Sequence, residues 1–276
     1  MDVPGGTSRL GSDVHYPEER PAREVTVRPF SLARTPTTVA QFAAFVDATG
    51  YATRAERDLG GSAVFTPPRH PVDLRDPRQW WSWVEGASWR TPTGPGSTAE
   101  PDHPVTHVVL EDALAYCAWA GLRLPVEREW EHAARGGLAG AAYAWGDDRV
   151  DDTGEVPAVV FRGAFPWRSE GRAGTARVGS HPPNGFGLLD VTGNVWELVD
   201  TAWSPRHSAA DPDADPGATP CCAPTSRTAG VVAKGGSFLC SDDYCSRYRP
   251  ASRIPIALDS PTAHVGFRCA RSGPSR

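Results

Sequence analysis

The chain has 276 residues and a formal net charge of −5, from 33 acidic and 28 basic residues. This mildly acidic balance gives no electrostatic basis for binding nucleic acid or an anionic membrane surface. No apolar run reaches the roughly 20 residues that a membrane-spanning helix needs. The N-terminal residues lack the charged start and apolar core of a signal peptide, so we expect a cytoplasmic protein, and a monomer.

Glycine and proline are abundant, with 28 and 27 residues, and favour turns over long regular elements. Ten tryptophans and nine phenylalanines argue against disorder, because disordered chains are poor in aromatic residues. No internal repeat or linker divides the chain. We therefore expect one domain over residues 1–276, of the α+β class, with a high content of irregular structure.

The first expected elements in chain order are a strand at 23–27 and a helix at 39–48. Thr38 and Gln41 have the spacing of a capping box, and Gly50 supplies a stop for the helix. The apolar face of this helix consists of Val39, Phe42, Phe45 and Val46.

Two more helices follow in the middle of the chain. One is expected at 111–120, ending at Gly121, with an apolar face formed by Ala113, Leu114 and Cys117. The next begins after Pro125 and ends at Gly136, and its inward residues are Trp130 and Ala133.

The last part of the chain is expected to form strands at 231–234 and 266–270. The stretch 203–230 before them is rich in Pro, Asp, Ala and Thr, so we expect a mobile surface loop there. This loop contains Cys221 and Cys222, to which no pattern assigns a role.

The most informative segment carries Cys240 and Cys245, which follow a Gly-Gly pair in a C-x4-C spacing. This spacing differs from the C-x2-C of zinc ribbons and thioredoxin-like motifs. Two thiolates without a nearby imidazole suit Cu(I), which prefers sulfur ligands. Arg247 and Arg249 are placed to lower the thiol pKa. From spacing alone, a structural disulfide between the two cysteines is equally compatible.

Further motifs extend over nearly the whole chain: Arg123-Leu-Pro-Val-Glu-Arg-Glu-Trp-Glu131, Pro182-Pro-Asn-Gly-Phe-Gly-Leu188, Gly193-Asn-Val-Trp-Glu197, Gly235-Gly-Ser-Phe-Leu-Cys240 with Tyr244-Cys245, and Gly266-Phe-Arg-Cys269. With these motifs the sequence resembles the formylglycine-generating enzymes, also called sulfatase-modifying factors. The resemblance implies their fold, which is related to C-type-lectin-like folds. The paired cysteines are the feature that separates these enzymes from relatives with other activities.

The resemblance also implies a reaction. Such enzymes use O2 to oxidise the cysteine of a Cys-x-Pro-x-Arg motif in an unfolded sulfatase polypeptide to Cα-formylglycine. By this likeness, Cys240 and Cys245 bind Cu(I) as thiolates. Ser237 and Tyr244 match positions that line the substrate pocket, and Trp196 matches a tryptophan that faces the oxygen site.

A structural Ca2+ site is implied by the same likeness, because hard oxygen donors suit this ion. Its ligands would come from Asp190, Val191, Gly193, Val195 and Glu197. Asn184 and Asn194 are expected to serve turn geometry rather than metal binding. Cys117 and Cys269 align with a disulfide of secreted relatives, and we expect buried thiols here because the cytosol is reducing.

Two other interpretations remain open at this point. One is a non-catalytic relative of the same fold that binds peptides or proteins. The other is an iron-dependent sulfoxide synthase, which is less favoured because its histidine ligand cluster is not seen. Asp242 and Asp243 form an acidic insert between the cysteines, which either changes how an arginine-containing peptide is held or alters only the surface.

Overall fold

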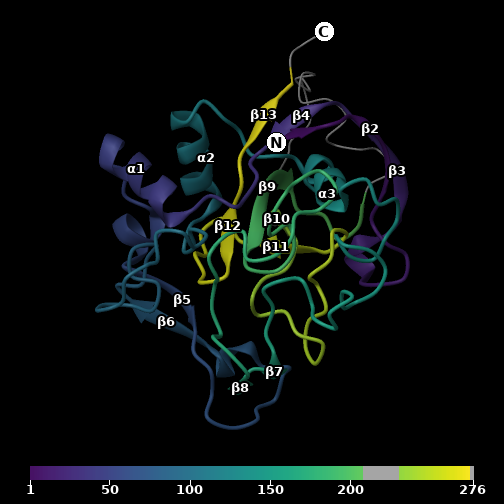
Figure 1. Ribbon diagram of the computed structural model, residues 1–276. Coiled ribbons are helices and arrows are strands. Elements are labelled where there is room, and N and C mark those ends of the chain that lie inside the picture. The colour runs from purple at the N-terminus through teal and green to yellow at the C-terminus, as the bar shows by residue number, and fades with distance from the viewer. Residues whose placement is uncertain (208–229, 274–276) are drawn as a thin grey trace.

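The computed structural model describes residues 1–207 and 230–273. Its centre is a four-stranded sheet in the order β11-β10-β9-β12, in which β12 runs parallel to β9 and the other pairs are antiparallel. Figure 1 shows α1 and α2 together at one side of this sheet, away from α3. The bounds are β9 Trp196–Ala202, β10 Val231–Lys234, β11 Arg253–Ile256, β12 Val265–Phe267, α1 Val39–Thr49, α2 Leu110–Trp119 and α3 Glu127–Arg135.

Shorter elements surround the central sheet. A three-stranded sheet has the order β1-β4-β13, and three antiparallel pairs are formed by β2 with β3, β5 with β6, and β7 with β8. Their bounds are β1 Asp2–Val3, β2 Gly6–Leu10, β3 Arg23–Val27, β4 Phe30–Leu32, β5 Gly61–Phe65, β6 Trp81–Glu85, β7 Gly163–Ala164, β8 Arg168–Ser169 and β13 Ala270–Ser272, with single-turn helices η1 Pro17–Glu19, η2 Ala55–Leu59 and η3 Pro77–Gln79.

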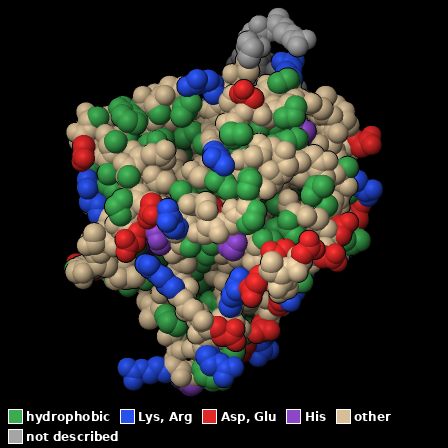
Figure 2. All heavy atoms as spheres, viewed as in Figure 1, with side chains coloured by type: hydrophobic (Ala, Val, Ile, Leu, Met, Phe, Trp, Pro, Cys, Tyr) green, Lys and Arg blue, Asp and Glu red, His purple; other side chains and the backbone are tan. Residues whose placement is uncertain are grey.

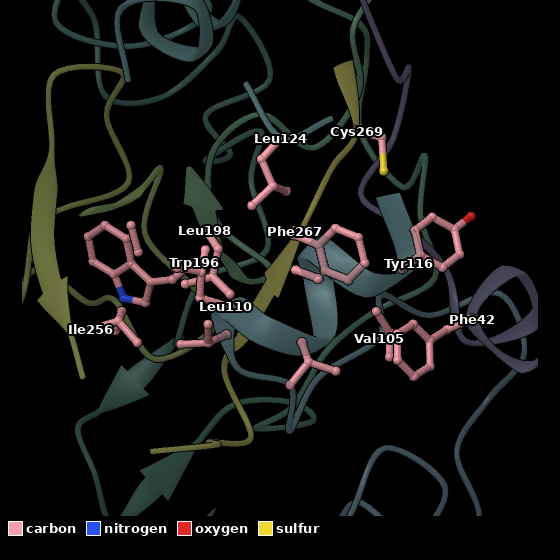
Figure 3. Packing of buried hydrophobic residues seen from close by; sticks show 14 of the residues in the cluster. Phe42, Val105, Leu110, Tyr116, Leu124, Trp196, Leu198, Ile256, Phe267 and Cys269 are labelled. Atoms are coloured by element: carbon pink, nitrogen blue, oxygen red, sulfur yellow. The ribbon is translucent and has the colours of Figure 1, made fainter. Parts of the chain in front are cut away.

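The two faces of the central sheet bury different clusters. Alternate residues of a strand point to opposite faces, so Leu198 joins the cluster with α1 and α2, whereas Val199 joins the cluster with α3. Figure 3 shows the first cluster, with Trp196 and Ile256 at one end and Phe42 and Tyr116 at the other. The two faces of β9 thus contact separate cores, and Trp196 packs in the same cluster as Leu198.

The predicted helix at 39–48 is confirmed as α1, with its capping box between Thr38 and Gln41. Gly50 ends it in the left-handed conformation, at φ 68°. The second helix is confirmed as α2, but the prediction that Leu114 lies on its buried face was wrong. Leu114 is 36% exposed, because the apolar residues of the buried face are Leu110, Ala113, Tyr116 and Cys117; the helix also begins one residue earlier than expected.

The strands predicted at 23–27 and 231–234 are confirmed as β3 and β10, but the single strand predicted at 266–270 was wrong. Phe267 pairs with Leu198 in the central sheet, whereas Ala270 pairs with Leu32 in the three-stranded sheet. Where the chain passes from one sheet to the other, Arg268 turns inward and binds the buried carboxylate of Glu197.

The third helix is confirmed as α3, and its charged residues are buried as well as its apolar ones. Glu131 binds Arg135 at 2.7 Å and Lys234 at 3.0 Å, and Glu127 binds Lys234 and Arg253. Buried charges need such partners, because an unpaired ion inside a protein is strongly unfavourable. The sequence pattern did not predict these buried ion pairs. We call Glu127, Glu131, Arg135, Lys234 and Arg253 the ionic layer.

Most of the loop predicted at 203–230, including Cys221 and Cys222, lies outside the described residues. Every helix within the described ranges is too short or too polar to cross a membrane. Figure 2 shows acidic and basic side chains mixed over one face, with acidic ones gathered toward its lower right edge.

Candidate active site

The chain leaves β10 through Gly235 and Gly236, whose φ angles are 91° and 79°. A Cβ on Gly235 would lie 2.9 Å from the Trp130 ring, and one on Gly236 would lie 2.7 Å from the Arg247 carbonyl oxygen. Glycine is therefore required at both positions, by backbone conformation and by close packing. The two glycines thus allow a sharp turn after β10, and the segment from Ser237 onward lies against the core.

The structure brings Cys240 and Cys245 together, with their Sγ atoms 3.3 Å apart. The Cys240 side chain is buried, whereas Cys245 is half-buried. Both are free thiols, because the separation exceeds the roughly 2.05 Å of a disulfide. The Cys245 backbone N–H donates to the Ser241 carbonyl at 2.8 Å, so a tight turn sets the approach of the two sulfur atoms.

The two thiols differ in acidity. Burial, and then the hydrogen bond with Cys245, raise the pKa of Cys240 well above its usual range. The hydrogen bond from Cys240, with a further contribution from the positive charge of Arg247, lowers the pKa of Cys245 to about 7. Arg247 thus has the predicted effect on a thiol, whereas the guanidinium of Arg249 is bound to the buried carboxylate of Glu19.

Both sulfur atoms line a cavity of about 170 Å³. One group of lining residues is aromatic: Trp80, Trp81, Phe165, Trp196 and Tyr244. The others are Ser237, Leu239, Cys240, Cys245, Arg247, Ile254 and His264. Such a largely apolar hollow with a few polar groups is typical of a small binding site. All five residues predicted as catalytic therefore line the same cavity.

Ser237 and Tyr244 occupy different parts of this wall. Ser237 is buried, and its Oγ accepts a hydrogen bond from the Leu239 backbone N–H at 3.3 Å. The Tyr244 ring stacks on Phe165 with a centroid distance of 4.6 Å and lies edge-on to Trp80 at 5.4 Å. Tyr244 is 41% exposed, so it forms the rim of the cavity rather than its base.

Sequence reasoning missed His264 as a cavity residue. Its carbonyl accepts from the Trp196 backbone N–H at 2.8 Å, and its ring lies 4.8 Å from that of Trp81. Desolvation, and then the charge of His107, lower the pKa of His264 to about 3. A lone histidine in a loop carries no spacing signal, and only the pairing of β12 with β9 brings it to the cavity.

Four of the residues predicted to hold calcium lie in the segment 190–195 before β9, and the fifth, Glu197, lies in β9 itself. Asp190 has a φ of 50°, and its Oδ2 accepts from the Gly179 backbone N–H at 2.5 Å. Its Oδ1 is buried and has no hydrogen-bond partner among the described residues. Burial raises the pKa of Asp190. An open, buried carboxylate oxygen is what a hard cation would occupy.

Glu197 has a different environment from Asp190. Its carboxylate accepts two hydrogen bonds from Arg268, both at 2.6 Å, and one from Trp130 Nε1 at 2.6 Å. Arg268 Nη2 also donates to the Asp190 carbonyl at 3.0 Å. Three of about four acceptor positions on the Glu197 carboxylate are therefore filled. A cation here would depend on Asp190 and on the main-chain carbonyls of Val191, Gly193 and Val195 more than on Glu197.

The two asparagines serve turns, as predicted. Asn194 has a left-handed φ of 59°, and its side chain bonds both polar groups of the Ala176 backbone. Asn184 Oδ1 accepts from the Phe186 and Leu188 backbone N–H groups. These contacts hold the segments that pack beside the calcium-ligand candidates.

The two other cysteines within the described residues, Cys117 and Cys269, and the acidic insert also have defined surroundings. Cys117 and Cys269 are buried free thiols with Sγ atoms 3.3 Å apart. Asp242 binds Arg149 at 2.8 Å and accepts from the Tyr248 hydroxyl at 2.5 Å, at the edge of a hollow of about 320 Å³. This pairing turns Asp242 away from the thiol cavity, whose lining residues do not include it.

Comparison with known proteins identifies the class. The family described as sulfatase-modifying factor enzyme 1-like domain matches residues 1–273. The chain therefore belongs to the formylglycine-generating enzyme, or sulfatase-modifying factor, family.

Individual relatives cover the chain almost completely. The chain is 49% identical to the formylglycine-generating enzyme of Mycobacterium tuberculosis, over 98% of this chain and 96% of that protein. It is 47% identical to the formylglycine-generating enzyme of Thermomonospora curvata, over 97% of this chain and 91% of that protein. Among solved structures, PvdO of Pseudomonas aeruginosa superimposes with a TM-score of 0.70 and 25% identity, covering 99% of this chain and 94% of that chain.

Proposed function

We propose that this protein is a copper-dependent oxidase that converts the cysteine of a Cys-x-Pro-x-Arg motif in unfolded sulfatase polypeptides to Cα-formylglycine with O2. The observation that carries the proposal is the pair of free thiols, 3.3 Å apart, in the wall of an aromatic cavity. The family and the names of its relatives support the same reaction.

The thiol pair fits a Cu(I) ion, because sulfur is the donor that this ion prefers. The described residues contain no group of three or more His, Cys, Asp or Glu side chains that is arranged to hold a metal. A copper site at Cys240 and Cys245 would therefore use two protein ligands and leave room for the sulfur of the substrate. When bound there, copper would supply the one-electron chemistry with O2 that no side chain of the cavity provides.

The protein residues would prepare the site for this metal. Cys245 is partly ionised near neutral pH, since its pKa is about 7, and thiolate is the form that binds metals. Cys240 would lose its proton on metal binding, as ligand thiols do. The aromatic wall formed by Trp80, Trp196 and Tyr244 would exclude water from the reacting cysteine.

The overall reaction needs a reductant. The substrate –CH2–SH group and O2 combine with two protons and two electrons to give an aldehyde, hydrogen sulfide and water. The carbon loses two electrons and O2 gains four, so the other two electrons must come from an added reductant, such as a thiol.

A structural Ca2+ ion is part of the proposal. Its site would be formed by Asp190, with the carbonyls of Val191, Gly193 and Val195 and the remaining acceptor position of Glu197. The unpartnered, buried Oδ1 of Asp190 is the observation that supports it. The ion would stiffen the turn that leads into β9, and thus the position of Trp196.

The alternative is a non-catalytic relative that uses the cavity only to bind a peptide. The presence of Cys240, Cys245, Ser237, Tyr244 and Trp196 around one cavity favours the oxidase, because a binding protein has no need for two reactive thiols.

The experiment is mass spectrometry of a synthetic Cys-x-Pro-x-Arg peptide after incubation with Cu(I)-loaded protein, a thiol reductant and O2. We expect a product that has lost sulfur and gained one oxygen, and that reacts with a hydrazide. The same peptide with serine in place of cysteine is the control. A peptide that binds but remains unchanged would support the non-catalytic alternative.

A further inference from the structure

The side chain of Arg247 lines the thiol cavity, and residues from the N-terminal part of the chain hold it in place. Its Nη2 donates to Glu18 Oε1 at 2.6 Å, and its Cζ lies 3.6 Å from the centroid of the Tyr16 ring. A carboxylate and an aromatic face thus fix the guanidinium in one orientation beside Cys245.

The N-terminal turn is also held by a second, more deeply buried ion pair. Glu19, the neighbour of Glu18, is fully buried and receives two hydrogen bonds from Arg249, at 2.6 and 3.0 Å. That bidentate pair already anchors η1 against the segment after the cysteines. The Glu18–Arg247 pair is more exposed, at 19% and 23%, and therefore calls for another explanation.

Much of the donor capacity of Arg247 is unused. A guanidinium carries five N–H donors. Nη1 makes only a long contact of 4.0 Å with Cys245 Sγ, and Nε has no partner within the described residues. The donors next to Cys245 are thus available to a molecule that enters the cavity.

The charge of the site indicates what kind of acceptor fits. Glu18 pairs with Arg247 at 2.6 Å and offsets part of its positive charge, so the site attracts an anion less than an unpaired guanidinium would. The neighbouring wall is aromatic, which favours a neutral group. A main-chain carbonyl oxygen of a bound polypeptide is a neutral acceptor, and such oxygens flank any cysteine placed over the thiol pair.

We propose that Arg247 is a substrate-binding residue that donates from Nη1 to a main-chain carbonyl oxygen next to the reacting cysteine, and that Glu18 is the positioning residue that orients it. The inference rests on the proposed function, since it requires a polypeptide substrate in this cavity. It adds to that function a recognition contact that is independent of the side chains of the substrate motif.

The first test measures binding without turnover. Metal-free, reduced protein is titrated with a fluorescent Ser-x-Pro-x-Arg peptide, in which serine replaces the reacting cysteine. We expect Arg247→Gln to weaken binding about tenfold or more, the usual loss for a hydrogen bond to a charged group. Glu18→Gln should weaken it less, because the guanidinium remains but loses its orientation. Glu111→Gln is the matched control, since Glu111 binds Arg57 at the same 2.6 Å on another surface.

The second test identifies the carbonyl. A set of peptides, each with one main-chain carbonyl replaced by a thioamide, is titrated against wild type and Arg247→Gln. One position should weaken binding to wild type but not to the variant, because the two changes remove the same hydrogen bond. In steady-state turnover of the cysteine peptide by Cu(I)-loaded protein, in which metal binding has already removed the Cys245 proton, Arg247→Gln should raise KM and leave kcat little changed.

Unaltered affinity of Arg247→Gln and Glu18→Gln, a loss confined to kcat, or no thioamide coupled to Arg247 would each overturn the inference. The proposed function would stand in those cases, provided that wild type oxidises the cysteine peptide. If wild type neither binds nor oxidises the peptides, the proposed function and the inference both fail. Thermal unfolding of each variant verifies folding, and Glu18→Gln keeps the test decisive if Arg247→Gln does not fold.

Discussion

Cys240 and Cys245 lie five positions apart in the chain, yet they differ in both burial and acidity. Their sulfur atoms are 3.3 Å apart, with Cys240 buried and Cys245 at the cavity edge. The hydrogen bond between them favours the ionised form of Cys245 and the protonated form of Cys240. The acidity of each thiol thus depends on the other, and the chemistry of the pair depends on both.

Replacement of either cysteine by alanine is expected to abolish peptide oxidation, because a single thiolate cannot form the two-sulfur site. The measurement is the mass spectrum of the peptide after incubation with each variant. Cys117→Ala is the control, since Cys117 is also a buried thiol 3.3 Å from another thiol, that of Cys269. It should lose stability but keep activity, and normal turnover by Cys240→Ala or Cys245→Ala would rule the mechanism out.

Alkylation of the metal-free, reduced protein should label Cys245 before Cys240. The rate at Cys245 should rise with pH and reach half of its maximum near pH 7, because thiolate is the reactive form and its pKa is about 7. Iodoacetamide labelling followed by peptide mapping gives the pH profile of each cysteine. Arg247→Gln should shift the Cys245 profile to higher pH, and prior labelling of Cys240 would contradict the assignment.

Stability should depend on the protonation of His107, which is fully buried and whose Nδ1 lies 2.7 Å from Ser62 Oγ. Burial lowers the pKa of His107 from 6.5 to about 4. Between these values the unfolded chain binds the proton and the folded chain does not, so the free energy of unfolding decreases as pH falls from 6.5 to 4. The loss amounts to about 3 kcal/mol by linkage.

The variant His107→Asn tests this dependence, because asparagine tolerates the left-handed φ of 60° and does not titrate. Urea unfolding at several pH values should give a flatter profile than wild type below pH 6.5. His70→Asn, at an exposed position, should retain the wild-type profile. An unchanged slope in His107→Asn would contradict the prediction.

Lys234 is the only lysine in the chain and is fully buried, with Nζ 3.0 Å from Glu131 and 3.4 Å from Glu127. Lys234→Met should lower the free energy of unfolding by about 3 kcal/mol, because two buried carboxylates lose a shared cation. Chemical denaturation measures the change. Arg75→Met, which removes an exposed pair with Asp73, should leave the denaturation midpoint unchanged.

An amine-reactive reagent gives a second measurement on Lys234. The native protein should be modified at the N-terminal amine and not at Lys234, because no water or reagent reaches a side chain with 0% exposure. Mass spectrometry should detect labelled Lys234 only after unfolding. Rapid labelling of the native protein at Lys234 would show that the ionic layer opens.

Calcium removal is expected to destabilise the protein. A ligand that binds only the folded state adds stability that is lost with it. The melting temperature of wild type should therefore fall in EGTA and recover in excess Ca2+. Asp190→Ala should melt at the same temperature with and without Ca2+, because it lacks the open Oδ1. A wild-type melting temperature insensitive to chelation would contradict the site.

Local patterns in the sequence were sufficient to predict the helix ends, which depend on contacts between residues close together in the chain. The capping box of Thr38 and Gln41, and the glycines at 50 and 136, define helix ends through contacts within one turn, and the structure agrees with them. The strand at 266–270 was predicted wrongly because its two ends pair with strands of different sheets, β9 and β4, and both partners are distant in the chain. Leu114 was assigned to the wrong face because the pattern did not show that Tyr116, rather than Leu114, continues the buried face of Ala113 and Cys117.

The sequence by itself determined the α+β class, the family resemblance and the five catalytic candidates, because motif residues remain recognisable without a structure. Only the tertiary structure decided how close the two sulfur atoms lie, which of them is exposed, and which other residues share their cavity. His264 reaches it through β12 and Arg247 is oriented by Glu18, from positions at opposite ends of the chain. Acidity and cavity shape depend on burial and on distances between such remote segments, and these exist only once the chain has folded.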